Sequence, residues 1–530
     1  MYKRIQIILN RESVASATSL IFISYIASSF LGLFRNRILA TYFGDSSELG
    51  VFYLADKLPN FIFSTLVFSV LSTSFIPICV SIYKKKREDL DDFVSGSIAL
   101  FIFIYLLIII PILIFPNFFA SLLSWNSLSA SNTSLLSAIL IWDLISQLLF
   151  IIVSFLSAYL QSLKKFIVPA LTPILFNLGV VLGIYLLHSE FGIFSTVMGM
   201  FIGNIFTIIF VLTFIFKINF VFNFNIFSYL KNSNAKKLLV VASPRFLGIL
   251  IQRLYILLIG GLISYIYKNP AYLVVYEYAN QLQTMPVQAF GNSLSQVLLP
   301  TFSELAEFSK KRQIAKTLNR YLLKLTFFIM PVICVFLVLK IPLVRILYGG
   351  DKFSWLGTNL TSYTLAFFSV SIWFQSINAV FFRVFYSFKN SIVPTISSII
   401  ALISAFILAL YFGLSLGWGL WSIALAFTVG SVLQSVYLYF YINKLLGQVF
   451  SYSINSYLKI FYSTLITGFI LYVLMQFFDN YVFDTTRTLP LLFFTGLVVL
   501  ISFFTYFIFL DFVGVKIARK VFNNLILLLK

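Results

Sequence analysis

The chain has 530 residues, of which 60% are hydrophobic and 10% charged, and its formal net charge is +20 at pH 7. Because soluble domains carry roughly 25% charged residues, this composition excludes a soluble domain with a polar surface. The long apolar runs favour membrane-spanning helices over the short alternating strands of a β-barrel. The two cysteines, Cys79 and Cys334, both lie in apolar runs, which argues against a disulfide framework or a metal centre.

The apolar runs predict an all-α polytopic membrane protein. A membrane-spanning helix needs about 20 predominantly apolar residues, and about fourteen segments meet that measure. In chain order, the predicted spans are 15–34, 51–82, 96–118, 134–162, 166–187, 192–216, 238–265, 271–302, 321–344, 358–385, 391–413, 418–443, 455–477 and 489–511.

The lysines and arginines gather on the loops of one side of these spans. If the N-terminus is cytoplasmic, 27 of the 37 lysines and arginines fall on cytoplasmic segments, as the positive-inside rule requires. Both termini are therefore predicted to be cytoplasmic. The positive net charge is then a topology signal and an attraction to anionic membrane lipids. A nucleic-acid partner is not expected, because the sequence has no soluble basic domain.

Two pairs of segments indicate an internal duplication. YLQSLKKFIVPALTPIL (159–175) matches FYSFKNSIVPTISSII (385–400), and residues 54–77 match residues 278–300, at offsets of 223 to 225 positions. The offset contains an even number of spans, so the two repeats have the same orientation in the membrane. Parallel repeats of this kind are typical of transporters that open a central cavity alternately to each side.

The duplication predicts three parts. Residues 1–230 form an N-terminal six-helix lobe, and residues 231–446 form a C-terminal six-helix lobe around a central cavity. Residues 447–530 add two further transmembrane helices and a cytoplasmic amphipathic tail.

The stretch PRFLGILIQRL (244–254) places two arginines in an apolar span. From a helix start near residue 238, Arg245 lies about 10 Å and Arg253 about 22 Å into the span. A charge that faces lipid at mid-membrane costs at least ~2.5–3.5 kcal/mol. Both side chains should therefore face a polar cavity or a carboxylate, and Gln252 falls on the same side of the helix.

Several of these stretches together resemble the MurJ (MviN-type) lipid II flippases of the multidrug/oligosaccharidyl-lipid/polysaccharide exporter (MOP) superfamily. The motifs that carry the resemblance are SSFLGLFRNRILATYFG (28–44), DKLPNF (56–61), FIPICVSIYKK (75–85), AYLQSLKKFIVPALTPILFN (158–177), YANQLQTMPVQAFGNSLSQVLLPTFSELA (278–306), IPLVRILYGGDKF (341–353) and FFRVFYSFKNSIVP (381–394).

The resemblance implies transport of a lipid-linked peptidoglycan precursor from the inner to the outer leaflet, in a bacterial cytoplasmic (inner) membrane. It also implies a cavity lined with arginines, and Arg35 falls on one such position. The sequence departs from the family pattern at four charged positions, which are here Ser29, Gly50, Phe63 and Gln281.

We therefore expect a cationic cavity that binds an anionic polyprenyl-diphosphate glycan. The candidate lining residues are Arg35, Arg245, Arg253, Gln252, Gln281, Asn280 and Lys57. The alternative for the arginines is a buried structural ion pair, and the candidate partners are Asp143, Glu277 and Asp56.

Three other kinds of function remain open. The first is transport of a different cargo, either another polyprenyl-linked glycan or a small cation or drug. The second is a polyprenyl-dependent membrane enzyme, and the third is a lipid-binding scaffold. An enzyme would need a base or paired carboxylates near the membrane surface, and EDLDD (88–92) is predicted to be a solvated loop. No nucleotide-binding loop is present in the sequence, so we expect an ion gradient or the membrane potential as the energy source. Neither a cofactor nor a metal is expected, and the chain is predicted to be a monomer among membrane lipids.

Overall fold

The computed structural model describes residues 14–83, 88–223, 229, 233–447, 454–481 and 487–515. Every regular element in these ranges is a helix, which confirms the predicted all-α class. The chain divides into two compact units, Met1–Val274 with Gly350–Phe353 and Val275–Gly349 with Ser354–Lys530. The predicted lobe boundary near residue 230 derives from sequence repetition and stays a prediction.

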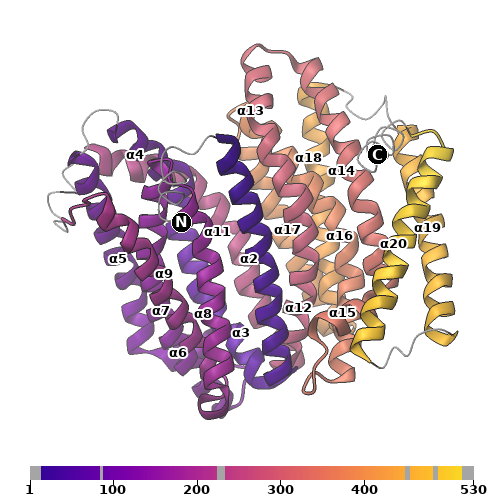
Figure 1. Ribbon diagram of the computed structural model, residues 1–530, viewed down its shortest axis with the longest axis horizontal. Coiled ribbons are helices and arrows are strands. Elements are labelled where there is room, and N and C mark those ends of the chain that lie inside the picture. The colour runs from indigo at the N-terminus through magenta and orange to yellow at the C-terminus, as the bar shows by residue number, and fades with distance from the viewer. Residues whose placement is uncertain are drawn as a thin grey trace, which may run out of the picture. The chain divides into compact units, whose positions relative to one another are not determined.

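Among the described residues, the first unit contains ten α-helical or π-helical elements up to residue 217 and one long helix after them (Figure 1). In chain order they are α2 (Val14–Phe43), α3 (Ser47–Phe63), the π-helical turns η1 (Ser64–Phe68) and η2 (Leu71–Phe75), α4 (Ile76–Tyr83), α5 (Glu88–Ile114), α6 (Pro116–Leu123), α7 (Ala130–Ser162), α8 (Ile167–Phe191), α9 (Phe194–Lys217) and α11 (Ser233–Tyr267).

The second unit begins within α12 and continues to the C-terminal helices, which are yellow in Figure 1. Its elements are α12 (Ala271–Pro286), η3 (Val287–Asn292), α13 (Ser293–Glu307), α14 (Lys311–Val338), α15 (Lys340–Tyr348), α16 (Trp355–Ser387), α17 (Ile392–Leu410), η4 (Tyr411–Ser415), α18 (Trp421–Leu446), α19 (Ile454–Tyr481) and α20 (Thr488–Phe512).

Serine side chains cap three of these helices at their N-termini. The hydroxyl oxygens of Ser46, Ser129 and Ser354 accept hydrogen bonds from backbone N–H groups three residues on, at the starts of α3, α7 and α16. Each cap satisfies one of the N–H groups that a helix start leaves without an intrahelical partner. These local signals fix where three of the long helices begin.

Twelve helices of the described residues are long and apolar enough to cross a membrane, so the predicted total of fourteen is not confirmed. The two predicted spans outside this set are 15–34 and 271–302. Helix α2 covers the first of them, and α12, η3 and α13 together cover the second. Both of these predicted segments are therefore helical, and the exact number of spans stays a prediction.

The duplicated stretches share a break in regular helix geometry. The π-helical turn η1 begins at Ser64 and η3 begins at Val287, which are 223 positions apart, as in the sequence repeat. Each π-helical turn follows directly on a helix that contains a proline, Pro59 in α3 and Pro286 in α12. Such turns are rare and occur frequently at functional sites.

Glycines allow α8 and α9 to pack at very short range. A Cβ atom added to Gly179 would lie 2.2 Å from the Cα of Gly203, and one added to Gly183 would lie 2.2 Å from the Cα of Gly199. The glycines on each helix are four residues apart, so they share one face. This is the small-residue pattern that permits close approach of transmembrane helices, whose association depends on van der Waals packing.

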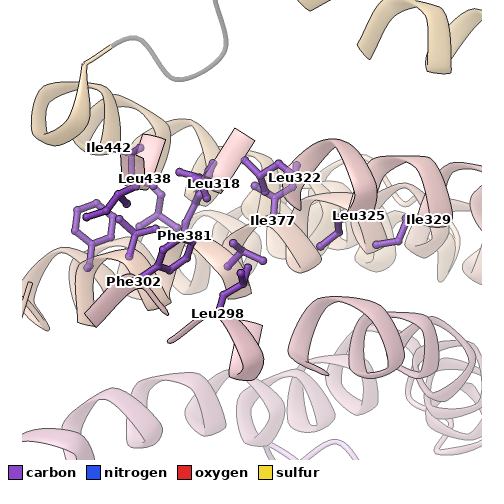
Figure 2. Packing of buried hydrophobic residues seen from close by; sticks show 14 of the residues in the cluster. Leu298, Phe302, Leu318, Leu322, Leu325, Ile329, Ile377, Phe381, Leu438 and Ile442 are labelled. Carbon is purple, nitrogen blue, oxygen red and sulfur yellow. The ribbon is translucent and has the colours of Figure 1, made fainter. Parts of the chain in front are cut away.

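An apolar core joins four helices of the second unit (Figure 2). Leu298 and Phe302 of α13, Leu318 and Leu322 of α14, Ile377 and Phe381 of α16, and Leu438 and Ile442 of α18 are buried in it. Helix α19 packs against both α14 and α20, and α20 also packs against α15, so the two C-terminal helices join the rest of this unit at α14 and α15.

The acidic segment EDLDD was predicted to be a solvated loop, and this prediction is wrong. Residues 88–92 form the first turn of α5, where carboxylates stabilise the positive end of the helix dipole. Asp91 accepts a hydrogen bond from the Tyr159 hydroxyl at 3.0 Å and one from the backbone N–H of Val221 at 3.3 Å. Asp91 therefore ties the start of α5 to α7 and to the segment after α9.

Candidate functional site

Arg35 lies on α2 and is held by amide oxygens. Its Nε donates to Oδ1 of Asn36 at 3.2 Å, and its Nη1 donates to Oδ1 of Asn177 on α8 at 3.4 Å. The Asn177 side chain is oriented in turn, because its Nδ2 donates to the carbonyl oxygen of Pro173 at 2.9 Å. Helices α2 and α8 pack against each other, so the arginine is positioned by the fold of the first unit.

No carboxylate of the described residues forms an ion pair with Arg35. The two amide oxygens accept hydrogen bonds from two of its five N–H groups and leave its positive charge uncompensated. Since Arg35 is only half-buried, its guanidinium can still accept an anionic group from outside the protein. The geometry at Arg35 therefore fits the predicted contact with phosphate oxygens.

Arg253 lies on the exposed side of α11. Its side chain is exposed, whereas Tyr255, Ile259 and Ile263 on other faces of the helix are buried. It forms no ion pair within the part of the chain that the structure describes. The side chains of Arg245 and Gln252 lie outside the described residues. Helix α11 packs against α3 and the π-helical turns that follow it, and the described contacts do not include one between Arg35 and Arg253.

Lys57 and the two candidate acids of the first unit lie on α3 and α7. The side chain of Lys57 is buried, and its aliphatic stem lies against α11, where a Cβ on Gly260 would be 2.7 Å from Cδ of Lys57. Asp143 on α7 is fully buried, and its carboxyl group lies near the Asp56 carboxyl group and the Gln147 amide, although neither of its oxygens forms a hydrogen bond with the described residues. The described contacts of Asp143 are therefore with another acid and an amide, and do not include Arg253.

The three candidate residues of the second unit lie on α12. Glu277, Asn280 and Gln281 are all half-buried. Oδ1 of Asn280 accepts a hydrogen bond from Nε2 of Gln283 at 2.9 Å. Gln283 in turn accepts hydrogen bonds at its Oε1 from Nε2 of Gln375 at 2.7 Å and from the Ser371 hydroxyl at 3.0 Å.

Sequence reasoning missed this network of amides between α12 and α16. Gln283 is 1% exposed, and buried amides are satisfied by hydrogen bonds because an unpaired buried polar group is costly. The available signal was the presence of Gln375 in the apolar run SVSIWFQSIN. An amide in such a run predicts a polar partner on another helix.

A second amide network joins α16, α17 and α18. Nδ2 of Asn378 donates to the backbone oxygen of Ser431 at 3.2 Å and to Oε1 of Gln434 at 3.1 Å, and its Oδ1 accepts from the Ser435 hydroxyl at 2.8 Å. Gln434 also donates to the hydroxyl oxygen of Ser398 at 3.3 Å. The polar groups of this second network are therefore joined by neutral hydrogen bonds.

These features define the class of protein: a polytopic helical membrane protein with polar and cationic groups inside its spans, as in a transporter of polar cargo. A solved MATE-family multidrug transporter of the MOP superfamily in an inward-facing conformation supports the fold. It is 13% identical, covers 80% of this chain and 95% of its own, and superposes with a TM-score of 0.62.

The family model described as lipid II flippase MurJ matches residues 39–493. The chain belongs to this family. A relative from Thermosipho africanus named lipid II flippase MurJ is 27% identical over 469 residues, covering 88% of this chain and 92% of the relative. A probable lipid II flippase MurJ from Aquifex aeolicus is 28% identical, covering 81% of this chain and 83% of its own.

A solved structure described as lipid II flippase MurJ in an inward closed conformation is also similar. It is 26% identical, covers 91% of this chain and 97% of its own, and superposes with a TM-score of 0.75. The family resemblance read from the sequence motifs is therefore confirmed.

Proposed function

We propose that this chain is a flippase that moves lipid II, the undecaprenyl-diphosphate-linked peptidoglycan precursor, from the inner to the outer leaflet by alternating access. The observation that carries the proposal is the family match over residues 39–493. The similar solved structure, whose description names the same activity and which covers 91% of this chain, supports it.

The physical task explains why arginines are needed inside the spans. The glycan headgroup and diphosphate of lipid II would lose their water in hydrocarbon without gaining hydrogen bonds, at a cost of several kcal/mol for each polar group. A protein that supplies replacement partners along the path lowers this cost. A guanidinium can bind two phosphate oxygens at once, which an ammonium cannot.

Arg35 is the best-supported contact for the diphosphate. Its partners are the neutral amides of Asn36 and Asn177, so it keeps an uncompensated charge. Arg253 is exposed on α11, and a charge in mid-span is expensive when it faces lipid. We propose that both arginines face the path of the cargo.

We propose that four further residues complete the polar path. They are Arg245, Gln252, Asn280 and Gln281. The protein is proposed to act in the bacterial cytoplasmic membrane as a monomer, with both termini in the cytoplasm and without catalysis of a bond change. The bias of lysines and arginines toward one side supports this orientation.

Complementation tests the function. A bacterium depleted of its own lipid II flippase and supplied with this chain should translocate the precursor and survive. Precursor that accumulates inside cells while the protein is stably inserted would show that lipid II is the wrong cargo. Another polyprenyl-linked glycan would then become the leading candidate.

Substitutions at Arg35 test the site. Arg35→Ala removes a hydrogen-bonding charge worth about 1.5–3 kcal/mol, so translocation should fall by roughly tenfold or more, while Arg35→Lys should retain part of the activity. Arg312→Ala is the matched control, because Arg312 is an exposed residue near the start of α14, and it should behave as the wild type. Loss of protein from the membrane in Arg35→Ala, without loss of specific activity, would assign Arg35 a structural role.

A further inference from the structure

A row of exposed side chains runs along α14 in the second unit. Lys316, Arg320 and Lys324 follow one another at intervals of four residues and are all exposed. Phe328, the next residue in the row, is 40% exposed. Residues four apart lie one above another on a helix, so these four side chains form one ridge, which we call the α14 ridge. Over about 18 Å the ridge changes from three cations to a phenyl ring.

Contacts between α14 and α19 place the ridge at the end of a membrane span. The Tyr457 hydroxyl donates to Oδ1 of Asn319 at 3.3 Å, and Tyr457 is the fourth residue of α19, which is long and apolar enough to span a membrane. Nζ of Lys459 donates to the backbone oxygen of Val513, directly after the end of α20, at 2.8 Å. The start of α19 and the end of α20 therefore meet near the level of Asn319, where lipid headgroups replace the hydrocarbon.

The three cations lie at the depth of these headgroups. The headgroup layer on each side of a bilayer is about 5–8 Å thick. Arg320 is adjacent to Asn319, and Lys316 and Lys324 lie about 5 and 8 Å from that level, on opposite sides. Their long side chains can extend along the helix to reach the headgroups. Phe328 lies about 14 Å from Asn319 on the side of the apolar part of α14, at the depth of the acyl chains.

The protein supplies no counter-charge to the ridge among the described residues. Helix α14 contains no aspartate or glutamate, and the three cations form no ion pair within the part of the chain that the structure describes. The nearest acids before α14 in the sequence, Glu304 and Glu307, are exposed on α13. Like charges four residues apart on a helix repel each other. An anion bound from outside the protein would remove this repulsion.

A phospholipid matches both parts of the ridge. Its phosphate complements the cations, and the planar guanidinium of Arg320 can bind two phosphate oxygens at once. Its acyl chain complements the exposed ring of Phe328. An acidic protein or a soluble anion would pair with the cations but would not use Phe328. Clusters of lysine and arginine next to a span attract anionic lipids in preference to neutral ones.

We propose that the α14 ridge binds one anionic glycerophospholipid of the surrounding membrane. The phosphate lies at Arg320, between Lys316 and Lys324, and an acyl chain lies along Phe328. The binding is non-covalent. The site concerns a lipid of the membrane and not the cargo, so it does not rest on the proposed function.

Photo-cross-linking tests the position of the site. The full-length protein in phosphatidylcholine nanodiscs is given phosphatidylglycerol with a photoreactive headgroup, at about 0.15 M salt, where the Debye length is about 8 Å. The label should map to peptides of α14. Unlabelled phosphatidylglycerol should compete with it, and additional phosphatidylcholine should not. Labelling confined to other helices, or equal competition by the two lipids, would overturn the proposal.

A triple variant tests the cations. A cation near an anionic membrane surface contributes about fivefold to affinity, so replacing all three by glutamine should weaken phosphatidylglycerol binding at least tenfold. Glutamine favours helix about as well as lysine and arginine. The substitutions are Lys316→Gln, Arg320→Gln and Lys324→Gln.

The matched control removes the same charge from the same end of the protein. Lys310→Gln, Lys311→Gln and Arg312→Gln change exposed residues at the start of α14, about 10 Å or more beyond Asn319 and outside the headgroup layer. This variant should weaken binding less than threefold. Equal losses in the two variants would overturn the proposal, because the effect would then be one of net charge.

Two further measurements complete the test. Glycerol phosphate and polyglutamate should displace the labelled lipid poorly, because neither has an acyl chain. Displacement as effective as that by phosphatidylglycerol would overturn the lipid assignment in favour of a soluble anion or an acidic protein. If the triple variant does not elute as a monodisperse protein, Arg320→Gln takes its place, with Arg312→Gln as its control and a loss of at least threefold expected for Arg320→Gln alone.

Discussion

Substitution of Gly183 by alanine should loosen the packing of α8 on α9. The added Cβ would lie 2.2 Å from the Cα and 2.7 Å from the backbone N of Gly199. Ordinary contacts of a Cβ begin at 3.4 Å, so the two helices must move apart by about 1 Å. Backbone atoms cannot rotate away as a flexible side chain can, so the whole interface must adjust.

The cost follows from the overpacking of a tight interface. Inserting a methyl group into a well-packed core typically destabilises a protein by about 1–3 kcal/mol. Separation of α8 and α9 would also weaken the van der Waals contacts at the neighbouring pair, Gly179 and Gly203. We therefore expect a value near the top of that range, and a larger one for Gly183→Val.

Thermal unfolding of the purified protein in detergent or nanodiscs measures the effect. With an unfolding entropy of about 2.1 cal/mol/K per residue, a chain of 530 residues shifts its midpoint by roughly 1 °C per kcal/mol, so the midpoint should fall by about 2–3 °C. Gly496→Ala is the matched control, because Gly496 also lies within a helix, α20, but no atom lies within 4 Å of its added Cβ. That variant should be unchanged or slightly more stable, since alanine favours a helix over glycine.

Equal midpoints for Gly183→Ala and Gly496→Ala would refute the reasoning. Such a result would mean that α8 and α9 have room to spare at this contact. Cross-linking of cysteines placed on the two helices would then show whether their spacing in the membrane differs from the one described.

Three other predictions follow from local contacts and from the topology. Asn378→Ala leaves its hydrogen-bonding partners on α18 unsatisfied, so we expect a loss of about 1–3 kcal/mol in unfolding measurements. Burial raises the pKa of Tyr229, outside the spans, to about 12; stability from its neutral form should be present below pH 10 and lost as the pH rises through 12, which a comparison with Tyr229→Phe in alkaline unfolding would measure. Cysteine at exposed Ser129 should react with an impermeant reagent from outside intact cells, and cysteine at Lys389 should not.

Hydropathy was sufficient to predict most of the helices. Twelve of the predicted segments meet the criteria for a span, because burial of an apolar helix in lipid depends on composition over about 20 residues and little on detail. The ends of the helices were less predictable. Residues 88–92 belong to α5 and not to the loop that the sequence predicted. Carboxylates at the start of a helix are stabilised by the helix dipole and by distant partners such as Tyr159. Local composition does not reveal these interactions.

The contacts of the candidate site could not be predicted in the same way. Charge complementarity suggested arginine partners for Asp143, whereas the structure places it beside Asp56, 87 positions earlier in the chain. A contact between distant helices depends on their rotation about their axes, which the period of an apolar span does not define. Similarly, π-helical turns such as η1 depend on one extra residue in a turn, which no pattern of apolar residues indicates.

The duplication gives the two units different chemistry at equivalent positions. Asp56 and Lys57 on α3 correspond to Asn280 and Gln281 on α12 at an offset of 224 positions. The first pair consists of an acid and a base, while the second consists of amides that carry no charge. Asn280 is held by Gln283 through a neutral hydrogen bond, so a change in proton concentration leaves that contact intact. The duplication has therefore kept the positions of these side chains on the two helices while the charged pair of one repeat is replaced by neutral amides in the other.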